Sequence, residues 1–253
     1  MTATPLADVA SEADRVLALA GEAGARTRLI GGVAIAKHLH LKLPEPLRRT
    51  YADIDLVVHH GEDRALRAAL EAGGYVPNVA FNSLRGDRRL LYYDQANGRQ
   101  LDVFVGTFSM CHVLELDDRL ALDPATLSPA DLLLTKLQVV EVNRKDQTDA
   151  LAIVLAHELA EERSGDVIGI DRIVSVTGHD WGWYTTANDN LTALRVVADE
   201  LLQDDARALA LERIDRITEE IAAAPKSIGW MARSKLGRRM RWYELPEEVR
   251  HGG

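Results

Sequence analysis

The sequence has one cysteine, few aromatic residues and no long hydrophobic run. Because Cys111 is the single cysteine, an internal disulfide and a zinc site built from several cysteines are both excluded. The best apolar run, residues 132–140, is interrupted by Thr135, Lys136 and Gln138, so we expect neither a membrane-spanning helix nor a membrane partner. Charged residues near the N-terminus are not typical of a secretory signal. Together these absences predict a cytoplasmic protein.

Negative charge dominates the chain, whose formal net charge is -9 at pH 7. Broad, sequence-independent binding of nucleic acid over the whole surface is therefore not expected. Residues 226–241 are the local exception, because they include six Lys or Arg residues and no acid. Aromatic residues lie in and beside this stretch (Trp230, Trp242 and Tyr243), a combination that suits RNA. The commoner alternative is a terminal helix that packs on its own domain.

The first half of the chain has a mixed α/β pattern. Hydrophobic periodicity predicts helices over residues 6–24, 33–41 and 62–72, and strands over 27–30, 53–59, 89–93, 100–105 and 112–116. Asn97-Gly98 predicts a hairpin that joins two of these strands. We therefore expect a mixed sheet with flanking helices in residues 1–125.

The second half is predicted to be mostly helical. Ser128 is a typical N-cap, and Pro129 then occupies the first helical position. From there the pattern is helical almost to the end of the chain. The expected fold class is thus α/β (α+β), with a core at 1–125 and a helical C-terminal region at 126–253.

Three carboxylates lie on two of the predicted strands. Asp53 and Asp55 are two residues apart, so both side chains point to the same face of their strand. Asp102 is a lone acid within a second apolar strand. Such acids are unfavourable unless a cation or a donor compensates them. If the strands are neighbours, the three carboxylates converge and predict a Mg²⁺ (or Mn²⁺) site, because hard oxygen ligands suit such ions.

Gly31 and Gly32 lie between the strand predicted at 27–30 and the helix that follows it. A glycine pair at this place lets the backbone approach a phosphate while the helix N-terminus supplies amide donors. A simple turn explains such a pair about equally well. An Asp-x-Asp pair alone is also a weak signal, so only the combination with the third acid is informative.

The order Gly-Gly, Asp-Ile-Asp and Leu-Asp-Val resembles the signature of the DNA-polymerase-β-like nucleotidyltransferase superfamily over residues 31–105. The resemblance implies a mixed-sheet catalytic core in which Asp53, Asp55 and Asp102 bind the metal ions and the glycine motif holds a triphosphate. Two features depart from that signature. The second residue of the glycine motif, usually Ser, is Gly32, and the spacing from Gly32 to Asp53 is longer than usual.

Further residues look like those of the AbiE-type toxin nucleotidyltransferases of type IV toxin–antitoxin systems. They are Arg49-Thr50, the segment 132–136 that ends in Lys136, and the segment 144–149 that ends in Asp149. The likeness implies that Lys136 and Asp149 complete the active site, that Arg49 belongs to the nucleotide site, and that a cognate antitoxin is a partner. The alternative, which does not depend on this likeness, is that Lys136 is a snorkelling lysine at the edge of the core.

The expected reaction moves a nucleoside monophosphate from a nucleoside triphosphate (NTP) to an acceptor hydroxyl and releases pyrophosphate. Asp53 and Asp55 would coordinate both metal ions, and Asp102 would hold the catalytic ion and help to deprotonate the acceptor. The acceptor stays open among tRNA or another RNA, a protein and a small molecule. The alternative is a non-catalytic descendant that keeps the fold as a binding or regulatory module.

Overall fold

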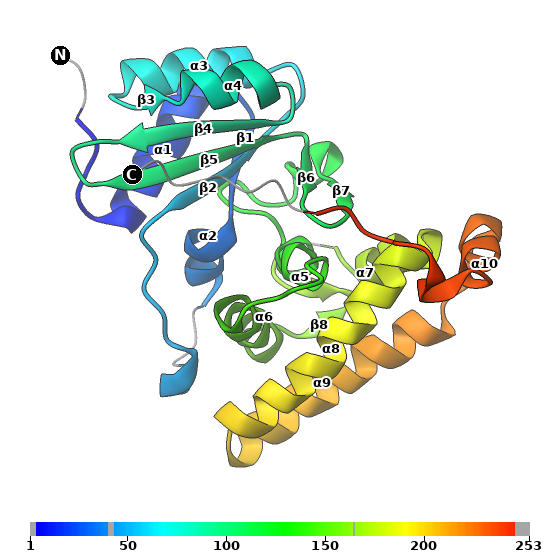
Figure 1. Ribbon diagram of the computed structural model, residues 1–253. Helices are drawn as coiled ribbons and strands as arrows, with labels where there is room; N and C mark the ends of the chain where they lie inside the picture. Colours follow the sequence, from blue (N-terminus) through cyan, green and yellow to red (C-terminus); the bar gives the residue numbers. More distant parts are fainter. Residues whose placement is uncertain (1–3, 40–42, 164, 246–253) are drawn as a thin grey trace.

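The computed structural model describes residues 4–39, 43–163 and 165–245. A mixed sheet forms one end of the molecule, and two long helices, α8 (Trp181–Leu201) and α9 (Asp204–Ala223), form the other (Figure 1). Helices α5 (Pro129–Leu137) and α6 (Arg144–Ala156) lie between these two ends. The predicted fold class, a mixed sheet with flanking helices followed by a mostly helical region, is confirmed.

The main sheet has five strands in the order β1-β2-β5-β4-β3. Strands β2 and β5 are parallel, and the other neighbouring pairs are antiparallel. The hairpin β4–β5 closes around Asn97-Gly98, as expected, and Gly98 has the positive φ of 65° that this turn requires. The strands are β1 (Thr27–Ile30), β2 (Ile54–Val58), β3 (Val76–Pro77), β4 (Arg89–Asp94) and β5 (Arg99–Val105).

Four helices flank this sheet. Asp8 caps the first of them, since its side chain accepts a hydrogen bond from the Ser11 N–H at 2.8 Å, so this helix starts later than the periodicity predicts. The second helix begins at Gly31 rather than at Val33, and the predicted residues 40 and 41 lie outside the described residues. The helices are α1 (Val9–Glu22), α2 (Gly31–His38), α3 (Asp63–Ala72) and α4 (Val79–Arg85).

Several short elements have no counterpart in the sequence expectations. Helix α4 is seven residues long with no buried residue, too short and too exposed to show helical periodicity. The strand expected at 112–116 is β7 (Val113–Glu115), which pairs with β6 (Thr107–Ser109) in a separate ribbon instead of joining the main sheet. The remaining short elements are β8 (Leu159–Ala160), β9 (Ile168–Gly169) and the 3-10 turns Glu45–Leu47, Asp117–Arg119 and Gly237–Arg239.

The helical region continues the core of the sheet. Leu29 in β1 accepts a hydrogen bond from Leu127 N–H at 3.1 Å and donates one to the Ala125 carbonyl at 2.8 Å. One cluster of buried apolar residues includes strands of the sheet, α5, α6, α8 and α9. The division at residue 125 stays a prediction, and packing is continuous across it. Helices α7 (Ile170–His179) and α10 (Ile228–Ser234) complete the region, and within the described ranges no helix is long and apolar enough to cross a membrane.

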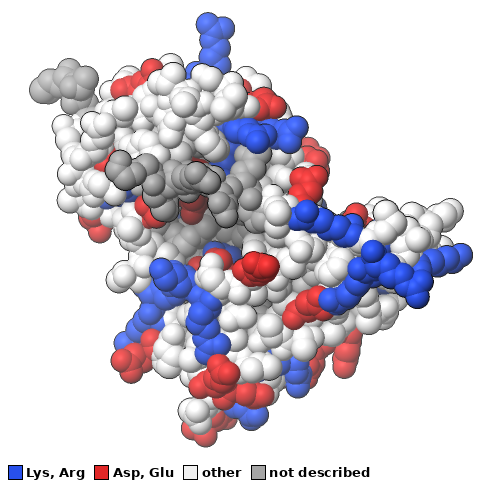
Figure 2. Space-filling model, viewed as in Figure 1, with Lys and Arg blue, Asp and Glu red and all other residues white. Residues whose placement is uncertain are grey.

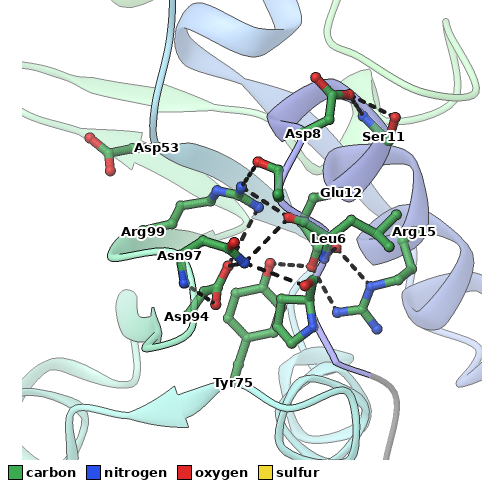
Figure 3. Close-up of polar contacts among 12 residues, drawn as sticks. Leu6, Asp8, Ser11, Glu12, Arg15, Asp53, Tyr75, Asp94, Asn97 and Arg99 are labelled. Atoms are coloured by element: carbon green, nitrogen blue, oxygen red, sulfur yellow. Dashed lines mark hydrogen bonds and ion pairs between the residues drawn. The ribbon is translucent and has the colours of Figure 1, made fainter.

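A buried polar network ties α1 to the hairpin end of the sheet (Figure 3). Glu12 is fully buried and accepts hydrogen bonds from Tyr75 Oη at 2.6 Å and from the Arg15 guanidinium. Arg99 donates to the carbonyl oxygens of Leu6 and Ala7 at 3.1 and 2.8 Å. Because these partners come from distant parts of the chain, the network fixes the position of the β4–β5 hairpin relative to α1.

Candidate active site

Asp55 and Asp102 lie side by side on the parallel strands β2 and β5. They are register partners, so their Cα atoms are separated by one strand spacing of about 4.8 Å. Side chains at paired positions project from the same face of a sheet. The two strands that carry the predicted acids are therefore neighbours, and the structure brings these two carboxylates together.

The Asp55 carboxylate differs from Asp102 in its contacts. It is half-buried, and within the described part of the chain no hydrogen bond or ion pair reaches it. Burial raises the pKa of Asp55 to about 7, and the neighbouring Asp102 carboxylate adds to the rise. The charge of Lys136 acts in the opposite direction and compensates only part of this effect.

Asp102 has partners for both of its oxygens. Arg89 Nε donates to Oδ1 at 2.8 Å and Gln100 Nε2 donates to Oδ2 at 2.6 Å. Sequence reasoning missed both donors. The hairpin register contains the signal, because Arg89 pairs with Phe104 and is thus the diagonal neighbour of Asp102 on one face.

Asp53 precedes β2 rather than lying on it, because the strand starts at Ile54. Its side chain is exposed, and Oδ1 accepts a hydrogen bond from the Gln100 N–H at 3.2 Å. Figure 3 shows Asp53 apart from the network around Glu12, with no contact to the other residues drawn. Asp53 and Asp55 both line one cavity of the site.

A cation would compensate Asp55. Among the described residues, no three His, Cys, Asp or Glu side chains are grouped so that they hold a metal ion by themselves. The unpartnered Asp55 carboxylate, with the exposed Asp53 beside it, fits a hard divalent ion that keeps several waters and contacts substrate phosphates. Each Asp102 oxygen accepts one hydrogen bond and keeps a second lone pair that could face such an ion. The metal-ligand role of the three acids stays a prediction.

Lys136, in the last turn of α5, is held by two acids of α6. Its Nζ lies 2.5 Å from Asp146 Oδ1 and 3.3 Å from Asp149 Oδ2. Burial acts to lower the pKa of Lys136, but the charges of Asp146 and Asp149 outweigh it and raise the pKa above its ordinary value. Lys136 thus keeps its charge in a half-buried place where two carboxylates hold it. Its role in the active site stays a prediction. Asn143 is the N-cap of α6: its side-chain oxygen accepts a hydrogen bond from the Asp146 N–H at 2.9 Å, and its amide donates to Asp146 Oδ2 at 2.7 Å.

Asp149 is the centre of a second set of contacts. Besides Lys136, it binds Arg49 (Nη1 to Oδ1, 2.5 Å) and accepts a hydrogen bond from Tyr51 Oη at 2.9 Å. The Arg49 guanidinium also lies 5.0 Å from the centre of the Tyr51 ring. Burial and the Asp149 carboxylate raise the pKa of Tyr51, which keeps its hydroxyl protonated. Asp149 thus joins Arg49 and Lys136, and all three were expected in the site. Tyr51, which sequence reasoning missed, contacts Asp149 and Arg49.

The glycine pair is shaped by two side chains of the site. Gly31 has a φ of +67°, and a Cβ there would lie 2.1 Å from Asp55 Oδ2. A Cβ on Gly32 would lie 2.0 Å from Cδ1 of the Tyr51 ring. Both positions therefore need glycine for packing alone. The departure from the usual Ser at Gly32 has a physical reason, because Tyr51 occupies the space of that side chain.

Two cavities share Asp55, Lys136 and Asp146 in their walls. One has a volume of about 310 Å³, and we call it the polar cleft; its walls include Gly32, Arg49, Asp53, Lys145 and Asp149. The other has a volume of about 160 Å³, and we call it the apolar lobe; its walls include Ile30, Phe104, Phe108, Met110 and Val139. The Asp55 carboxylate and the Lys136 ammonium thus lie where the polar cleft and the apolar lobe meet.

The basic stretch 226–241 packs on aromatic rings of its own chain. The Arg233 guanidinium lies 4.7 Å from the centre of the Trp181 ring, and the Arg238 guanidinium lies 5.1 Å from that of Trp242. Arg238 also pairs with Asp189 at 2.6 Å. Lys and Arg side chains gather on the surface over this end of the molecule (Figure 2). The packing agrees with the alternative of a terminal helix on its own domain, and binding of RNA there stays a prediction.

Comparisons with known proteins give distant likenesses only. No family model and no curated protein matches the sequence. Among solved structures, the chain is similar to a "putative nucleotidyltransferase from H. pylori", with a TM-score of 0.37 and 10% identity over 84% of this chain and 95% of the other. It is also similar to JHP933 from Helicobacter pylori, with a TM-score of 0.36 and 10% identity over 93% and 100% of the two chains. Such likenesses carry no argument about the site.

Proposed function

We propose that the protein is a metal-dependent nucleotidyltransferase that moves a nucleoside monophosphate from an NTP to an acceptor hydroxyl. One observation carries the proposal: the Asp55 carboxylate, beside Asp102, is without a partner among the described residues in the wall of a cleft that also presents Lys136. A carboxylate pair of this kind attracts a divalent cation, and a nearby ammonium attracts phosphate. An NTP with its metal ion supplies both partners at once.

The proposed reaction is an in-line displacement at the α-phosphorus. The acceptor oxygen bonds to the α-phosphorus, the bond to the oxygen that bridges the α- and β-phosphates breaks, and pyrophosphate leaves. The hydroxyl proton passes to the Asp102 carboxylate, whose orientation Arg89 and Gln100 hold. A bound Mg²⁺, held by Asp55 with Asp53 and Asp102, would neutralise charge at the reacting phosphate.

Positive groups of the polar cleft would bind the triphosphate. Lys136 and Arg49 line the cleft, and Asp149 contacts both of them, so it orients the two cations toward the same space. The first turn of α2 begins at Gly31 and adds backbone N–H groups that favour an anion. Charge placed in advance in this way stabilises the transition state of phosphoryl transfer.

Transfer of label from each NTP, carrying ³²P at the α-phosphate, to components of a cell extract tests the proposal. We expect Mg²⁺-dependent labelling of one class of acceptor, and loss of labelling in Asp55→Asn. Asp87→Asn is the matched control, because the Asp87 side chain is 74% exposed and lines neither cavity. Unchanged labelling by folded Asp55→Asn would refute the assignment.

The contacts of Asp102 and Lys136 favour a second candidate, a non-catalytic binding module of the same fold. Arg89 and Gln100 hold both Asp102 oxygens, and Asp146 and Asp149 hold Lys136, so neither group is free as the structure stands. Such a module would bind an NTP without transferring any part of it. Calorimetry with Mg²⁺ and each NTP, run beside the labelling experiment, separates the two candidates.

The resemblance to AbiE-type toxins supports a narrower form of the proposal. In that form the protein arrests growth by modifying RNA, a protein or a small molecule, and a cognate antitoxin opposes it. Induced expression of the chain in bacteria should then stop growth, whereas Asp55→Asn should not. Growth that is equally slow with both forms would contradict a toxin role that depends on transfer.

A further inference from the structure

The apolar lobe is a compartment for which the proposed reaction has so far no use. Its walls include the rings of Phe104 and Phe108, whose centres are 4.6 Å apart with a tilt of 57° between the planes. Met110 and Val139 are half-buried and add flexible and branched apolar surface. The volume of about 160 Å³ admits one ring system of modest size and no large chain.

Charge is confined to the edges of this lobe. Asp55, Lys136 and Asp146 form the part that it shares with the polar cleft. Arg89 is the other charged residue in its wall, and its guanidinium is paired with Asp102 and lies 5.0 Å from the centre of the Phe104 ring. Because Arg89 and Lys136 are already paired with carboxylates, a phosphate among the apolar walls would lose its hydration and gain few donors. An uncharged planar group suits them, because rings stack on aromatic faces and on a guanidinium plane.

The polar cleft has the opposite character. Arg49, Lys136 and Lys145 are in its walls, and Gly32 brings the first turn of α2 to its edge. The same walls hold four carboxylates, Asp53, Asp55, Asp146 and Asp149. A polyphosphate that brings a divalent cation therefore suits this side of Asp55, and an uncharged ring suits the other. A molecule with a polyphosphate at one end and a planar ring at the other matches both compartments.

Resting on the proposed function, we infer that the apolar lobe binds the base of the donor nucleotide, so that the NTP spans both cavities. The triphosphate lies in the polar cleft, the base packs against Phe108 and Phe104, and the α-phosphate lies between Asp55 and Lys136. This arrangement places the bond that breaks beside the carboxylates that the reaction uses. The acceptor then approaches from outside the two cavities.

Binding of two probes to the whole protein tests the inference. One probe is the set of four NTP analogues with a methylene group between the α- and β-phosphorus, which bind without transfer; the other is inorganic tripolyphosphate, which has no base. Both are titrated with Mg²⁺ by calorimetry. We expect at least one analogue to bind the wild-type protein about tenfold or more tightly than tripolyphosphate, the size of effect that a stacked base supplies.

Two variants probe the lobe itself. Phe108→Leu removes a ring, and Val139→Phe fills the lobe; each should weaken analogue binding by about tenfold and leave tripolyphosphate binding unchanged. Tyr93→Leu is the matched control for the first, since it removes a ring that lines neither cavity, and Val196→Phe is the control for the second, since Val196 is exposed on α8. Thermal unfolding verifies that each variant is folded. If Phe108→Leu is not folded, Val139→Phe still tests whether the base binds in the lobe.

The outcomes separate this inference from the proposed function. Equal affinity of the wild-type protein for tripolyphosphate and for all four analogues would overturn the base site. So would analogue binding that survives Val139→Phe while transfer falls, because the lobe would then hold the acceptor. Base-dependent analogue binding without any transfer would contradict the proposed function and support the base site.

Discussion

Asp55 and Asp102 are register partners on parallel strands, yet among residues 4–39, 43–163 and 165–245 hydrogen-bond donors reach Asp102 and none reaches Asp55. One member of the pair is therefore compensated, by Arg89 and Gln100, and the other carries a charge that its surroundings oppose. Two ionised carboxylates at this spacing repel each other in a partly dry site. The protein thus holds at Asp55 an unfavourable charge that a ligand of the cleft would relieve.

Replacing Asp55 should stabilise the protein at alkaline pH. Burial, followed by the charge of Asp102, raises the pKa of Asp55 from 3.8 to about 7. Between these pH values the folded state keeps a proton that the unfolded state has released, so stability falls as pH rises through this window. Asp55→Asn removes this loss and should raise the free energy of unfolding at pH 8 by on the order of 2 kcal/mol, with little change at pH 4.

Urea denaturation at pH 4, 6 and 8 in the presence of a chelator measures this difference. The gain should grow with pH, and Asp87→Asn, at an exposed position, should show no comparable trend. A gain that is the same at pH 4 and at pH 8 would mean that packing, and not the ionisation of Asp55, is responsible.

Divalent cations should stabilise the wild-type protein. A ligand that binds only the folded state adds about 2.7 kcal/mol at a concentration one hundred times its Kd. Titration with MgCl₂ or MnCl₂ at constant ionic strength should therefore raise Tm, and Asp55→Asn should abolish the rise. Equal rises in both proteins would place the ion elsewhere.

Much of the fold follows from local patterns that the sequence displays. The hairpin at Asn97-Gly98 and the N-cap at Ser128 were predicted because turn and cap residues act over a few positions. Strand β6, its pairing with β7 and helix α4 were not, since a three-residue strand and an exposed seven-residue helix have no clear period. Short elements of this kind depend on tertiary contacts.

The acids of the candidate site could be predicted from the sequence, whereas most of the residues that contact them could not. Asp55 and Asp102 stand out because an acid within an apolar strand is unusual. Arg89 and Tyr51 do not, since arginines near strand ends and tyrosines in loops are common. Their contacts depend on the hairpin register and on the path of the chain from α2 to β2, which residue spacing does not reveal.

Lys136 should matter more to activity than to stability. Lys136→Met should lower transfer by about 100-fold or more, because a fixed charge on the triphosphate is lost. It should destabilise the fold by about 1–3 kcal/mol, because Asp149 keeps Arg49 and Tyr51 as partners. The control is Lys37→Met, which breaks a more exposed pair with Asp14 at 2.7 Å and should cost less than about 1 kcal/mol. Transfer that is retained in a folded Lys136→Met variant would remove Lys136 from the reaction.

Gly32 and Tyr51 offer a test of why the glycine motif departs from its usual form. Gly32→Ser restores the common residue, but its Cβ would overlap the Tyr51 ring, so this change alone should destabilise the protein by about 1–3 kcal/mol. Tyr51→Ala should also destabilise it, since the hydroxyl that binds Asp149 is lost together with the ring.

Combining the two changes should recover part of the loss, because the serine then occupies space that the ring has left. The free energy of unfolding of Gly32→Ser/Tyr51→Ala should exceed the value expected from adding the two single effects by on the order of 1–2 kcal/mol. Urea denaturation of the four proteins of this cycle gives the coupling energy directly. Gly31→Ser serves as the contrast, because its Cβ would meet Asp55 instead and Tyr51→Ala should not rescue it. Strictly additive effects at Gly32 and Tyr51 would show that the ring does not determine which residue the motif accepts.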